Sequence, residues 1–401
     1  MLPRTILLLF TAAGLVASAP FAPILHAANI ADVIPGSWIV VMKEDITESA
    51  FAAHLANRDP EVVSRTKSTF RLTGFKGYSG SFTQALVDAL TSSIDIAWIE
   101  PDTKVRTLAL TTQANAPWGL ARISHREANA TDYIYDDSAG EGTFAYVLDT
   151  GIYTEHADFE GRATFGANFA GDGDNSDGHG HGTHCAGIIG SRTYGVAKKA
   201  QLIAVKVLDK DGAGSLSSII AGLNWVMEDV TAHHRIGIAV VNLSLGSIFS
   251  RSGNAAVRAA VKAGLFVGVA AGNDGVPALL SSPASAKTAC TVGASDIRDA
   301  RASFSNYGST VDIFAPGTDI TSTWINGPAN TRTISGTSMA APHVVGMAAY
   351  LLGLGNPKDP AQVCDQILGM ATQNKLSGTS GSFLTGLMGT PNLLAYNGNG
   401  A

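Results

Sequence analysis

Four short apolar runs constrain the fold of this chain more than any other feature. None of them alternates polar with apolar residues, which is typical of strands covered on both faces of a parallel sheet. Segments with helical spacing, 216–230 and 254–264, lie between the second and third runs and between the third and fourth. The sequence therefore predicts an α/β fold, with a parallel sheet and helices on both faces. The four runs are residues 144–148, 202–207, 238–243 and 265–270.

Polar residues follow three of these runs. Asp149 comes directly after the first run, Ser244 after the third, and Asn273 just beyond the fourth. Because ligands bind at the carboxyl ends of the strands in open parallel sheets, we expect these side chains to face one site. They supply an acid, a hydroxyl and an amide donor.

Two further segments supply a base and a nucleophile. "DGHGHGTHCAG" contains His181, and "SGTSMAAPHVVG" places Ser338 at the start of a helix rich in small residues. A serine hydroxyl is a weak nucleophile unless a base takes its proton and a carboxylate orients that base. We therefore predict Ser338 as nucleophile, His181 as base and Asp149 as the orienting acid. Pro342 is expected in the first turn of the helix, where its missing N–H matters least.

A histidine cluster allows a zinc site as an alternative. His179, His181 and His184 together could bind zinc, but no HExxH motif accompanies them. A zinc site would also leave Asp149 and Ser338 unexplained. We expect His184 to pack within a helix and His179 to lie in a loop.

The acidic segment 171–178 allows a calcium loop as another alternative. Counted from Asp172, Asp177 stands at the position where an EF-hand loop needs glycine, and Thr183 where it needs glutamate. The segment therefore does not match such a loop. We expect a solvated acidic turn.

Three segments, "AYVLDTGI", "HGTHCAG" and "SGTSMAAPHVVG", resemble the signature segments of the subtilisin-like serine proteases, in the chain order Asp, His, Ser. The stretches "NAPWGLARIS", "GSRTYGVAKKAQL", "SFSNYGS" and "TPNLLAYN" are similar to the proteinase K group of secreted fungal enzymes. The likeness covers nearly all of residues 113–397. It implies a subtilisin-like parallel sheet and a broadly specific serine endopeptidase. It also implies an oxyanion hole made by the Asn273 side chain and the Ser338 N–H.

The resemblance also implies which residues bind the substrate. Two segments would hold an extended peptide between them by β-augmentation, and a pocket would take the side chain before the cut, favouring apolar or aromatic residues. Ser247 stands where relatives often carry glycine, which bears on the shape of that pocket. The first segment is Gly212, Ala213 and Gly214, with Leu216 beside an upstream pocket; the second is Ser244, Leu245 and Gly246; the pocket is Ala270, Ala271 and Gly272.

Three cysteines allow one disulfide and one free thiol, and the residues alone leave three pairings open. The resemblance implies that Cys290 pairs with Cys364 and that Cys185 is free. Cys185 follows His184 on the expected catalytic helix, so a crosslink there would pull on the base.

The resemblance further implies one structural calcium ion. Its ligands would be the Asp312 carboxylate and the backbone carbonyls of Lys287 and Ala289. Hard oxygen ligands of this kind suit calcium. We expect no organic cofactor.

The N-terminus predicts a secretory signal peptide over residues 1–19. Arg4 precedes an apolar run over 6–17, and Ala17-Ser18-Ala19 offers a small-residue cleavage site. The run is shorter than the roughly 20 residues of a membrane span, which disfavours an anchoring helix, the alternative. The net charge is -6 and no Lys/Arg run is present, so we expect neither nucleic acid nor membrane as a partner. We expect a secreted, extracellular monomer.

Residues 37–106 have a pattern of their own. Strand-like and helical segments alternate in the order βαββαβ, which predicts a small α+β, ferredoxin-like unit, and 107–115 is expected to be a linker. "GYSGSF" and "IEPD" resemble the inhibitory propeptide of the same family. We therefore expect a propeptide over 20–110 that inhibits the enzyme, is removed by it, and precedes a peptidase domain over 111–401. A permanent N-terminal domain is the alternative.

Two other functions compete with a protease. A non-catalytic member of the family would bind peptides only, but the triad is intact. An esterase of the α/β-hydrolase type is disfavoured, because Ala340 replaces the last glycine of G-x-S-x-G and the triad order differs. The sequence thus favours protein and peptide substrates.

Overall fold

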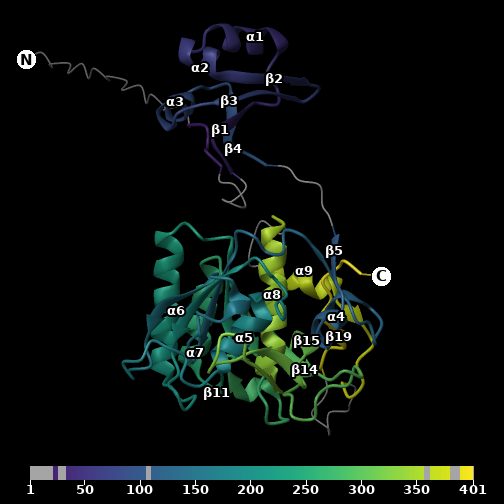
Figure 1. Cartoon of the computed structure of the whole chain (residues 1–401). Coiled ribbons are helices and arrows are strands. Elements are labelled where there is room, and N and C mark those ends of the chain that lie inside the picture. Colours follow the sequence, from purple (N-terminus) through teal and green to yellow (C-terminus); the bar gives the residue numbers. More distant parts are fainter. Residues whose placement is uncertain (1–20, 26–32, 105–109, 356–361, 380–388, 401) are drawn as a thin grey trace, which may run out of the picture. The chain divides into compact units, whose positions relative to one another are not determined.

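The computed structural model describes residues 21–25, 33–104, 110–355, 362–379 and 389–400 (Figure 1). They form two compact units, one on each side of residues 105–109. The expected signal peptide lies outside the described residues. Within the described residues, we find no helix that is both long enough and apolar enough to cross a membrane.

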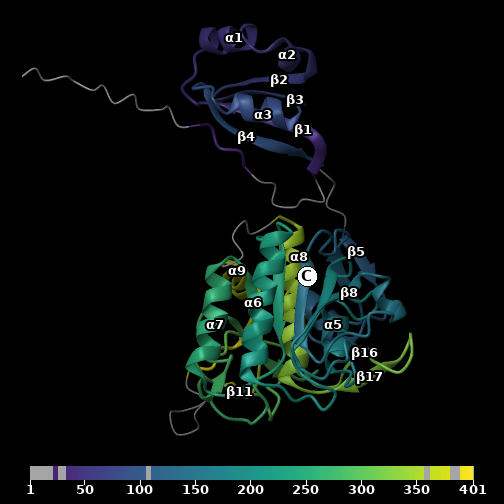
Figure 2. The same cartoon turned by 90° about the vertical axis from the view of Figure 1, so that its left-hand side faces the viewer.

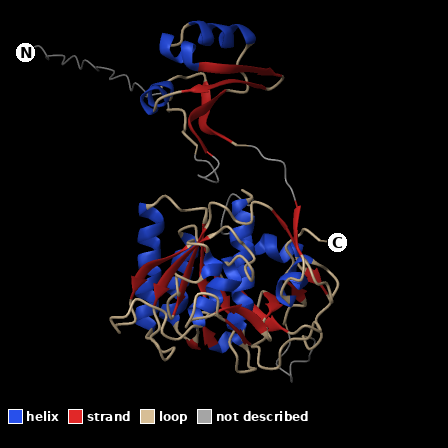
Figure 3. Ribbon diagram, in the orientation of Figure 1, coloured by secondary structure: helices blue, strands red, loops and turns tan. Residues whose placement is uncertain are grey.

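The N-terminal unit is a four-stranded antiparallel sheet with helices, as the sequence predicts (Figure 3). The spatial order β2-β3-β1-β4 is that of a ferredoxin-like βαββαβ unit. Its core is formed by Val40, Phe51, Tyr78, Val87 and Ile99, which are all fully buried. The elements are β1 (Val33–Met42), α1 (Glu48–Ala56), α2 (Pro60–Arg65), β2 (Thr66–Leu72), β3 (Phe75–Ser81), α3 (Gln84–Leu90) and β4 (Ile96–Thr103).

The short helix α2 is an addition to the predicted order. Asp59 caps it by accepting the Glu61 N–H at 2.7 Å, and Pro60 occupies its first position. An acceptor side chain followed by proline is a helix-start signal, so α2 could have been predicted from the sequence.

The second unit is built on a nine-stranded sheet. All neighbouring strands are parallel except β18 and β19, and the four predicted strands, β7, β9, β10 and β12, occupy four consecutive interior positions. In spatial order the strands are β18 (Thr372–Gln373), β19 (Leu393–Leu394), β15 (Ile313–Pro316), β14 (Cys290–Ser295), β12 (Phe266–Ala270), β10 (Ala239–Leu243), β7 (Phe144–Asp149), β9 (Gln201–Lys206) and β8 (Ala163–Asn168).

Helices cover both faces of this sheet (Figure 2). On β7, Ala145 and Val147 join the core under α5 and α8, whereas Tyr146 and Leu148 join the core under α6 and α7. Both alternating sets are buried, which explains why the run shows no polar alternation. The helices are α4 (Trp118–Ser124), α5 (His181–Gly190), α6 (Leu216–Ala232), α7 (Arg251–Lys262), α8 (Thr337–Gly353) and α9 (Val363–Met370), with short 3₁₀ turns at Ala157–Phe159 and Ala278–Leu280.

The expected linker is partly structured. Its residues from 110 onward include β5 (Leu110–Gln113), which pairs antiparallel with β6 (Tyr133–Asp136). The sequence "LTTQ" has one apolar residue in four, so no alternation marked it as a strand. Two more ribbons pair β11 (Ser247–Ile248) with β13 (Ser281–Ser282), and β16 (Ile320–Thr323) with β17 (Thr331–Ile334).

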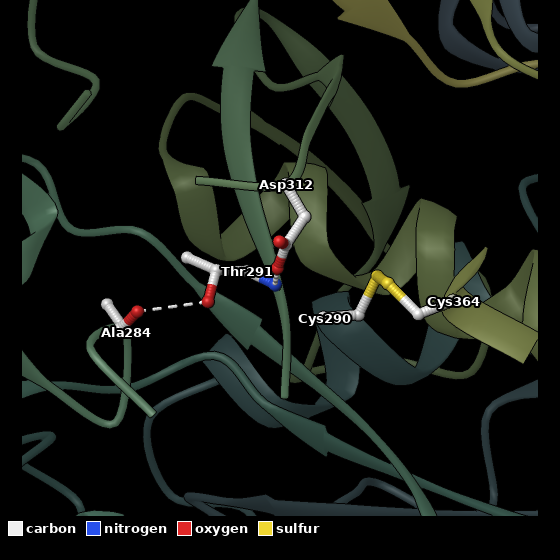
Figure 4. The surroundings of a disulfide bond; sticks show 5 residues. All are labelled: Ala284, Cys290, Thr291, Asp312 and Cys364. Carbon is white, nitrogen blue, oxygen red and sulfur yellow. Dashed lines mark hydrogen bonds between the residues drawn. A yellow bond between two sulfur atoms is a disulfide. The ribbon is translucent and has the colours of Figure 1, made fainter. Parts of the chain in front are cut away.

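The disulfide is the one that the family resemblance implies. Cys290 on β14 is bonded to Cys364 on α9, a sequence separation of 74 (Figure 4). Cys185 is free and buried on α5. A crosslink of this span restricts the unfolded chain and ties α9 to the sheet.

Candidate active site

The acid and the base of the predicted triad meet in the structure. Asp149 is the last residue of β7, and His181 is the first residue of α5. His181 Nδ1 donates to the fully buried Asp149 carboxylate, 2.8 Å from Oδ1 and 3.0 Å from Oδ2. With the proton on Nδ1, Nε2 is the basic nitrogen.

The same carboxylate raises the proton affinity of the imidazole. Burial by itself lowers the pKa of a histidine, because desolvation disfavours the cation. Against this burial, the charge of Asp149 and its hydrogen bond hold the pKa of His181 well above its ordinary value. The neutral imidazole that acts as a base therefore requires a pH above the usual range for histidine.

Ser338 is the second residue of α8, and its N–H has no acceptor within the first helical turn. Its hydroxyl donates to the Ser244 carbonyl at 3.1 Å, and no hydrogen bond joins it to His181 within the described residues. Cys185 Sγ lies 4.0 Å from His181 Nδ1 and 3.3 Å from the Ser338 carbonyl oxygen, so base and serine occupy one site. Serine–histidine contacts are often loose in free enzymes and tighten when substrate binds.

The expected position of Pro342 in the first turn is wrong. The helix begins at Thr337, so Pro342 is its sixth residue and interrupts the helical hydrogen bonds. Its missing N–H frees the Ser338 carbonyl, which instead accepts from Ser244 Oγ at 3.0 Å and from Cys185 Sγ at 3.3 Å. Neighbouring elements therefore anchor the backbone of the serine.

Asn273 is oriented as an oxyanion donor would be. Its Oδ1 accepts the N–H of Thr337 at 2.8 Å and the Thr337 hydroxyl at 2.9 Å. The same Thr337 hydroxyl accepts the Gly272 N–H at 3.1 Å, which fixes its direction. Because both donors engage the oxygen, the Nδ2 amino group is left as the donor for a ligand. Sequence reasoning missed Thr337, whose partner lies 64 residues away.

Two cavities of about 480 Å³ each border the site. The first holds the three residues expected in the pocket before the cut, together with Asn273, Ser338 and Ser247. The second brings both expected peptide-binding segments together with His181. Leu245 and Gly246 line both cavities. The expected residues found in the first cavity are Ala270, Ala271 and Gly272; those in the second are Gly212, Ala213, Gly214, Leu216, Ser244, Leu245 and Gly246.

The three histidines do not form a metal site. His184 is buried on α5, with Nε2 3.1 Å from the Ile320 carbonyl and 3.0 Å from the Arg332 carbonyl. Burial lowers the pKa of His184 to about 4. His179 lies exposed in the loop and lines the second cavity. Both histidines thus have the surroundings that the sequence predicts.

The expectation of a solvated turn over 171–178 is wrong for Asp177. Asp177 is 6% exposed, and its carboxylate accepts five hydrogen bonds from residues near Asp149 and His181 in the sequence. Asp172 also binds inward, 3.1 Å from the buried Lys206 ammonium. The sequence showed a run of acids but not their distant partners, which come from Thr150 just after β7, Lys206 on β9 and Thr183 on α5.

Asp312 has the surroundings of a cation ligand. Its carboxylate lies beside the Cys290–Cys364 disulfide, and Oδ2 accepts the Thr291 N–H at 2.7 Å (Figure 4). Burial, with a contribution from the nearby charge of Asp365, raises the pKa of Asp312 to about 6. No described basic side chain forms an ion pair with it. A divalent cation would compensate this charge, and a carboxylate oxygen is a ligand that calcium accepts.

Comparison with known protein families gives two matches. The Subtilase family matches residues 140–386, which include Asp149, His181 and Ser338. This protein is a subtilase. The Peptidase inhibitor I9 family matches residues 37–108, the N-terminal unit. The subtilase is therefore a serine endopeptidase with an N-terminal propeptide domain of the I9 family.

Named relatives of the subtilase are fungal proteases. It is 46% identical to "Subtilisin-like protease 2" of Pseudogymnoascus destructans over 383 residues, 94% of this chain and 93% of the relative. It is 48% identical to the "Cuticle-degrading protease" of Metarhizium anisopliae over 375 residues, 93% and 92% of the two chains. It is 46% identical to "Alkaline protease 1" of Aspergillus clavatus over 409 residues, 98% of each.

A solved structure is similar as well. The crystal structure of a cold adapted subtilisin-like serine proteinase is 40% identical and superposes with a TM-score of 0.64. The match covers 71% of this chain and 99% of that one. The predicted fold class and family are thus confirmed.

Proposed function

We propose that this subtilase is a secreted endopeptidase of broad specificity that is made as a zymogen and processes itself. The Asp149–His181 pair, held on the same site as Ser338, is the observation that carries the proposal. A buried carboxylate bonded to Nδ1 fixes the tautomer that a general base needs.

In the proposed reaction, Ser338 Oγ attacks the scissile carbonyl while His181 Nε2 takes its proton. Asp149 stabilises the imidazolium that forms. The Asn273 amino group and the Ser338 N–H donate to the oxyanion of the tetrahedral intermediate. His181 then protonates the leaving amine, and water hydrolyses the acyl-enzyme by the same steps.

The substrate is proposed to bind mainly through its main chain. The segments 212–214 and 244–246 face one cavity that also contains His181, as two strands flanking an extended peptide would. Ala270, Ala271 and Gly272 carry little side-chain volume beside Ser338, which leaves room for apolar or aromatic residues before the cut. Main-chain recognition with one roomy pocket supports broad specificity.

A structural calcium ion is proposed at Asp312. Lys287 and Ala289, the proposed carbonyl ligands, lie just before β14, whose residue Thr291 binds the Asp312 carboxylate. The ion would add positive charge beside the Asp312 carboxylate, whose pKa is raised by burial and by the nearby charge of Asp365. We propose no organic cofactor, and a monomeric enzyme.

Labelling and product analysis test the proposed activity. A fluorophosphonate probe should label wild-type Ser338, and mass spectrometry of casein fragments should show many cleavage sites. Ser338→Ala and His181→Ala should each abolish both signals almost equally, because triad members act as a unit. Residual casein cleavage by Ser338→Ala within tenfold of wild type would exclude the assignment.

A further inference from the structure

Asp177 lies outside the triad but accepts hydrogen bonds from the two segments that carry Asp149 and His181. Its Oδ1 accepts the Thr150 hydroxyl at 2.8 Å, the His179 N–H at 3.0 Å and the Gly180 N–H at 2.8 Å. Its Oδ2 accepts the Thr183 N–H at 2.9 Å and the Thr183 hydroxyl at 2.6 Å. Every one of these donors belongs to the segments that carry Asp149 and His181.

Two of the bonds serve the start of α5, the helix that begins with His181. The N-cap of this helix is Gly180, which has no side chain to accept the free N–H groups of the first turn. Asp177 replaces the missing cap, because it accepts from the N-cap residue itself and from Thr183, the third helical residue. The position of the catalytic base thus depends on a carboxylate in the preceding loop.

Thr150 links this cap to the acid of the triad. Its hydroxyl donates to Asp177 and accepts the Gly182 N–H at 3.0 Å. Its N–H donates to Asp149 Oδ1 at 2.8 Å, and its carbonyl accepts from the buried Lys206 Nζ at 3.0 Å. One residue therefore joins the acid, the helix of the base and the cap.

Two glycines let these segments pack backbone against backbone. Gly151 has φ +111°, and a Cβ there would lie 3.2 Å from Asp177 N and Cα. A Cβ on Gly182 would collide with the Gly151 carbonyl and lie 3.0 Å from Asp149 Cβ. With no side chains between the segments, a shift of Asp177 would pass directly to Asp149 and α5.

We propose that Asp177 is a positioning residue that holds Asp149 and His181 in the geometry for proton transfer. The proposal rests on the triad proposed above. Asparagine cannot take its place, because both carboxylate oxygens face N–H donors and an amide would turn its own NH₂ toward one set. Asp174, in the same turn, is a matched control, since its carboxylate is exposed and, among the described residues, accepts only from Ser176.

The test compares mature Asp177→Asn, Asp174→Asn and wild type in kcat and KM on a peptide p-nitroanilide across pH. We expect kcat on the alkaline plateau to fall roughly 10- to 100-fold for Asp177→Asn, as for other lost supporting contacts, with KM within about twofold. Asp174→Asn should match wild type. An unchanged kcat on the alkaline plateau would overturn the proposal. This holds even if Asp177→Asn lowers the melting temperature or shifts the acid limb of the pH profile.

A second pair of variants covers failure of Asp177→Asn to fold. Thr150→Val removes the hydroxyl that joins Asp177 to α5, whereas Thr150→Ser retains it. We expect a loss of plateau kcat in the valine variant and recovery in the serine variant; equal activity of the two would refute the proposal. Ser338→Ala distinguishes failure of the proposed triad from failure of the role proposed for Asp177. If Ser338→Ala is inactive while Asp177→Asn is fully active, the triad stands and only the role of Asp177 fails.

Discussion

At the scale of single residues, Thr337 decides which way the Asn273 amide points. Both donors of Thr337 bind Asn273 Oδ1, which leaves Nδ2 for the oxyanion. Asn273→Ala removes this donor, and in subtilisin loss of the corresponding amide reduces kcat roughly 10²- to 10³-fold. We expect a loss of that order here, with KM little changed, in steady-state hydrolysis of a peptide p-nitroanilide.

Variants of Thr337 serve as companions to that measurement. Thr337→Val keeps the N–H but loses the hydroxyl, so we expect a smaller fall in kcat, and Thr337→Ser should restore the rate. If Asn273→Ala kept a kcat within about fivefold of wild type, the amide would not be the oxyanion donor.

The pH dependence of activity follows from the Asp149–His181 pair. His181 acts as a base only when neutral, and its pKa is held well above the ordinary value by Asp149. Activity should therefore be present at alkaline pH and be lost as pH falls through that raised pKa. Asp149→Asn should move this acid limb to lower pH and reduce maximal kcat about 10⁴-fold, the effect known for the equivalent change in chymotrypsin-type enzymes. A wild-type acid limb below pH 6.5, the ordinary value for histidine, would contradict the raised pKa.

The residues of the proposed catalytic site could be singled out from the sequence, whereas the contacts that support them could not. Asp149, His181, Ser338 and Asn273 follow strands or begin helices, and three of them stand in segments that resemble a known family. Asp177 gave no such signal, because its role depends on Thr150, 27 residues away, meeting α5 in space.

At the scale of elements, burial decides what the sequence reveals. The runs that form β7, β9, β10 and β12 are apolar throughout because helices cover both faces, and they were found within about one residue. Shorter elements such as β5 and β18 depend on pairing with distant partners and carry no pattern of their own. The sequence predicted the position of α8, but it wrongly placed Pro342 in the first turn of this helix.

The calcium prediction belongs to the elements β14, β15 and α9, which meet around Asp312. Burial raises the pKa of this carboxyl to about 6, so folding favours its protonated form. In chelator, the contribution of Asp312 to stability should be present below about pH 4 and be lost as pH rises through about 6. Calcium binds the deprotonated form, so its stabilising effect should grow over the same range.

Melting temperatures measured with calcium and with chelator, from pH 4 to 8, check this dependence. Asp312→Asn should abolish the response to calcium, whereas Asp319→Asn, at an exposed position on the same unit, should retain it. An undiminished calcium response in Asp312→Asn would exclude Asp312 as a ligand.

At the scale of the whole molecule, the two units differ in how their strands connect. The N-terminal sheet is antiparallel and draws all its strands from residues 33–103, whereas the mostly parallel nine-stranded sheet draws its strands from residues 144–394 and joins them by long crossovers. Folding that depends on non-local contacts is slow and leaves intermediates exposed. A small unit that folds first could therefore assist the larger one, which is the role we predict for residues 37–106.

Self-processing is the last prediction. We place the mature N-terminus close to Thr111, with the segment 105–110 held in the peptide cleft before cleavage. Residues 105–109 lie outside the described ones. Leu110, the first residue of β5, pairs with Asp136 of β6, so cleavage after Leu110 would require Leu110 to leave this pairing.

N-terminal sequencing of the secreted protein should therefore begin near Thr111 for wild type, whereas Ser338→Ala, produced without other proteases, should stay full length after signal removal. Adding active enzyme in trans to Ser338→Ala separates the steps, because it should release the same N-terminus if the bond is accessible. Cleavage of Ser338→Ala at that bond in a protease-free system would disprove self-processing. A chain lacking residues 37–106 that reached full activity as quickly as the intact chain would disprove the chaperone role, since the parallel sheet would then fold unaided.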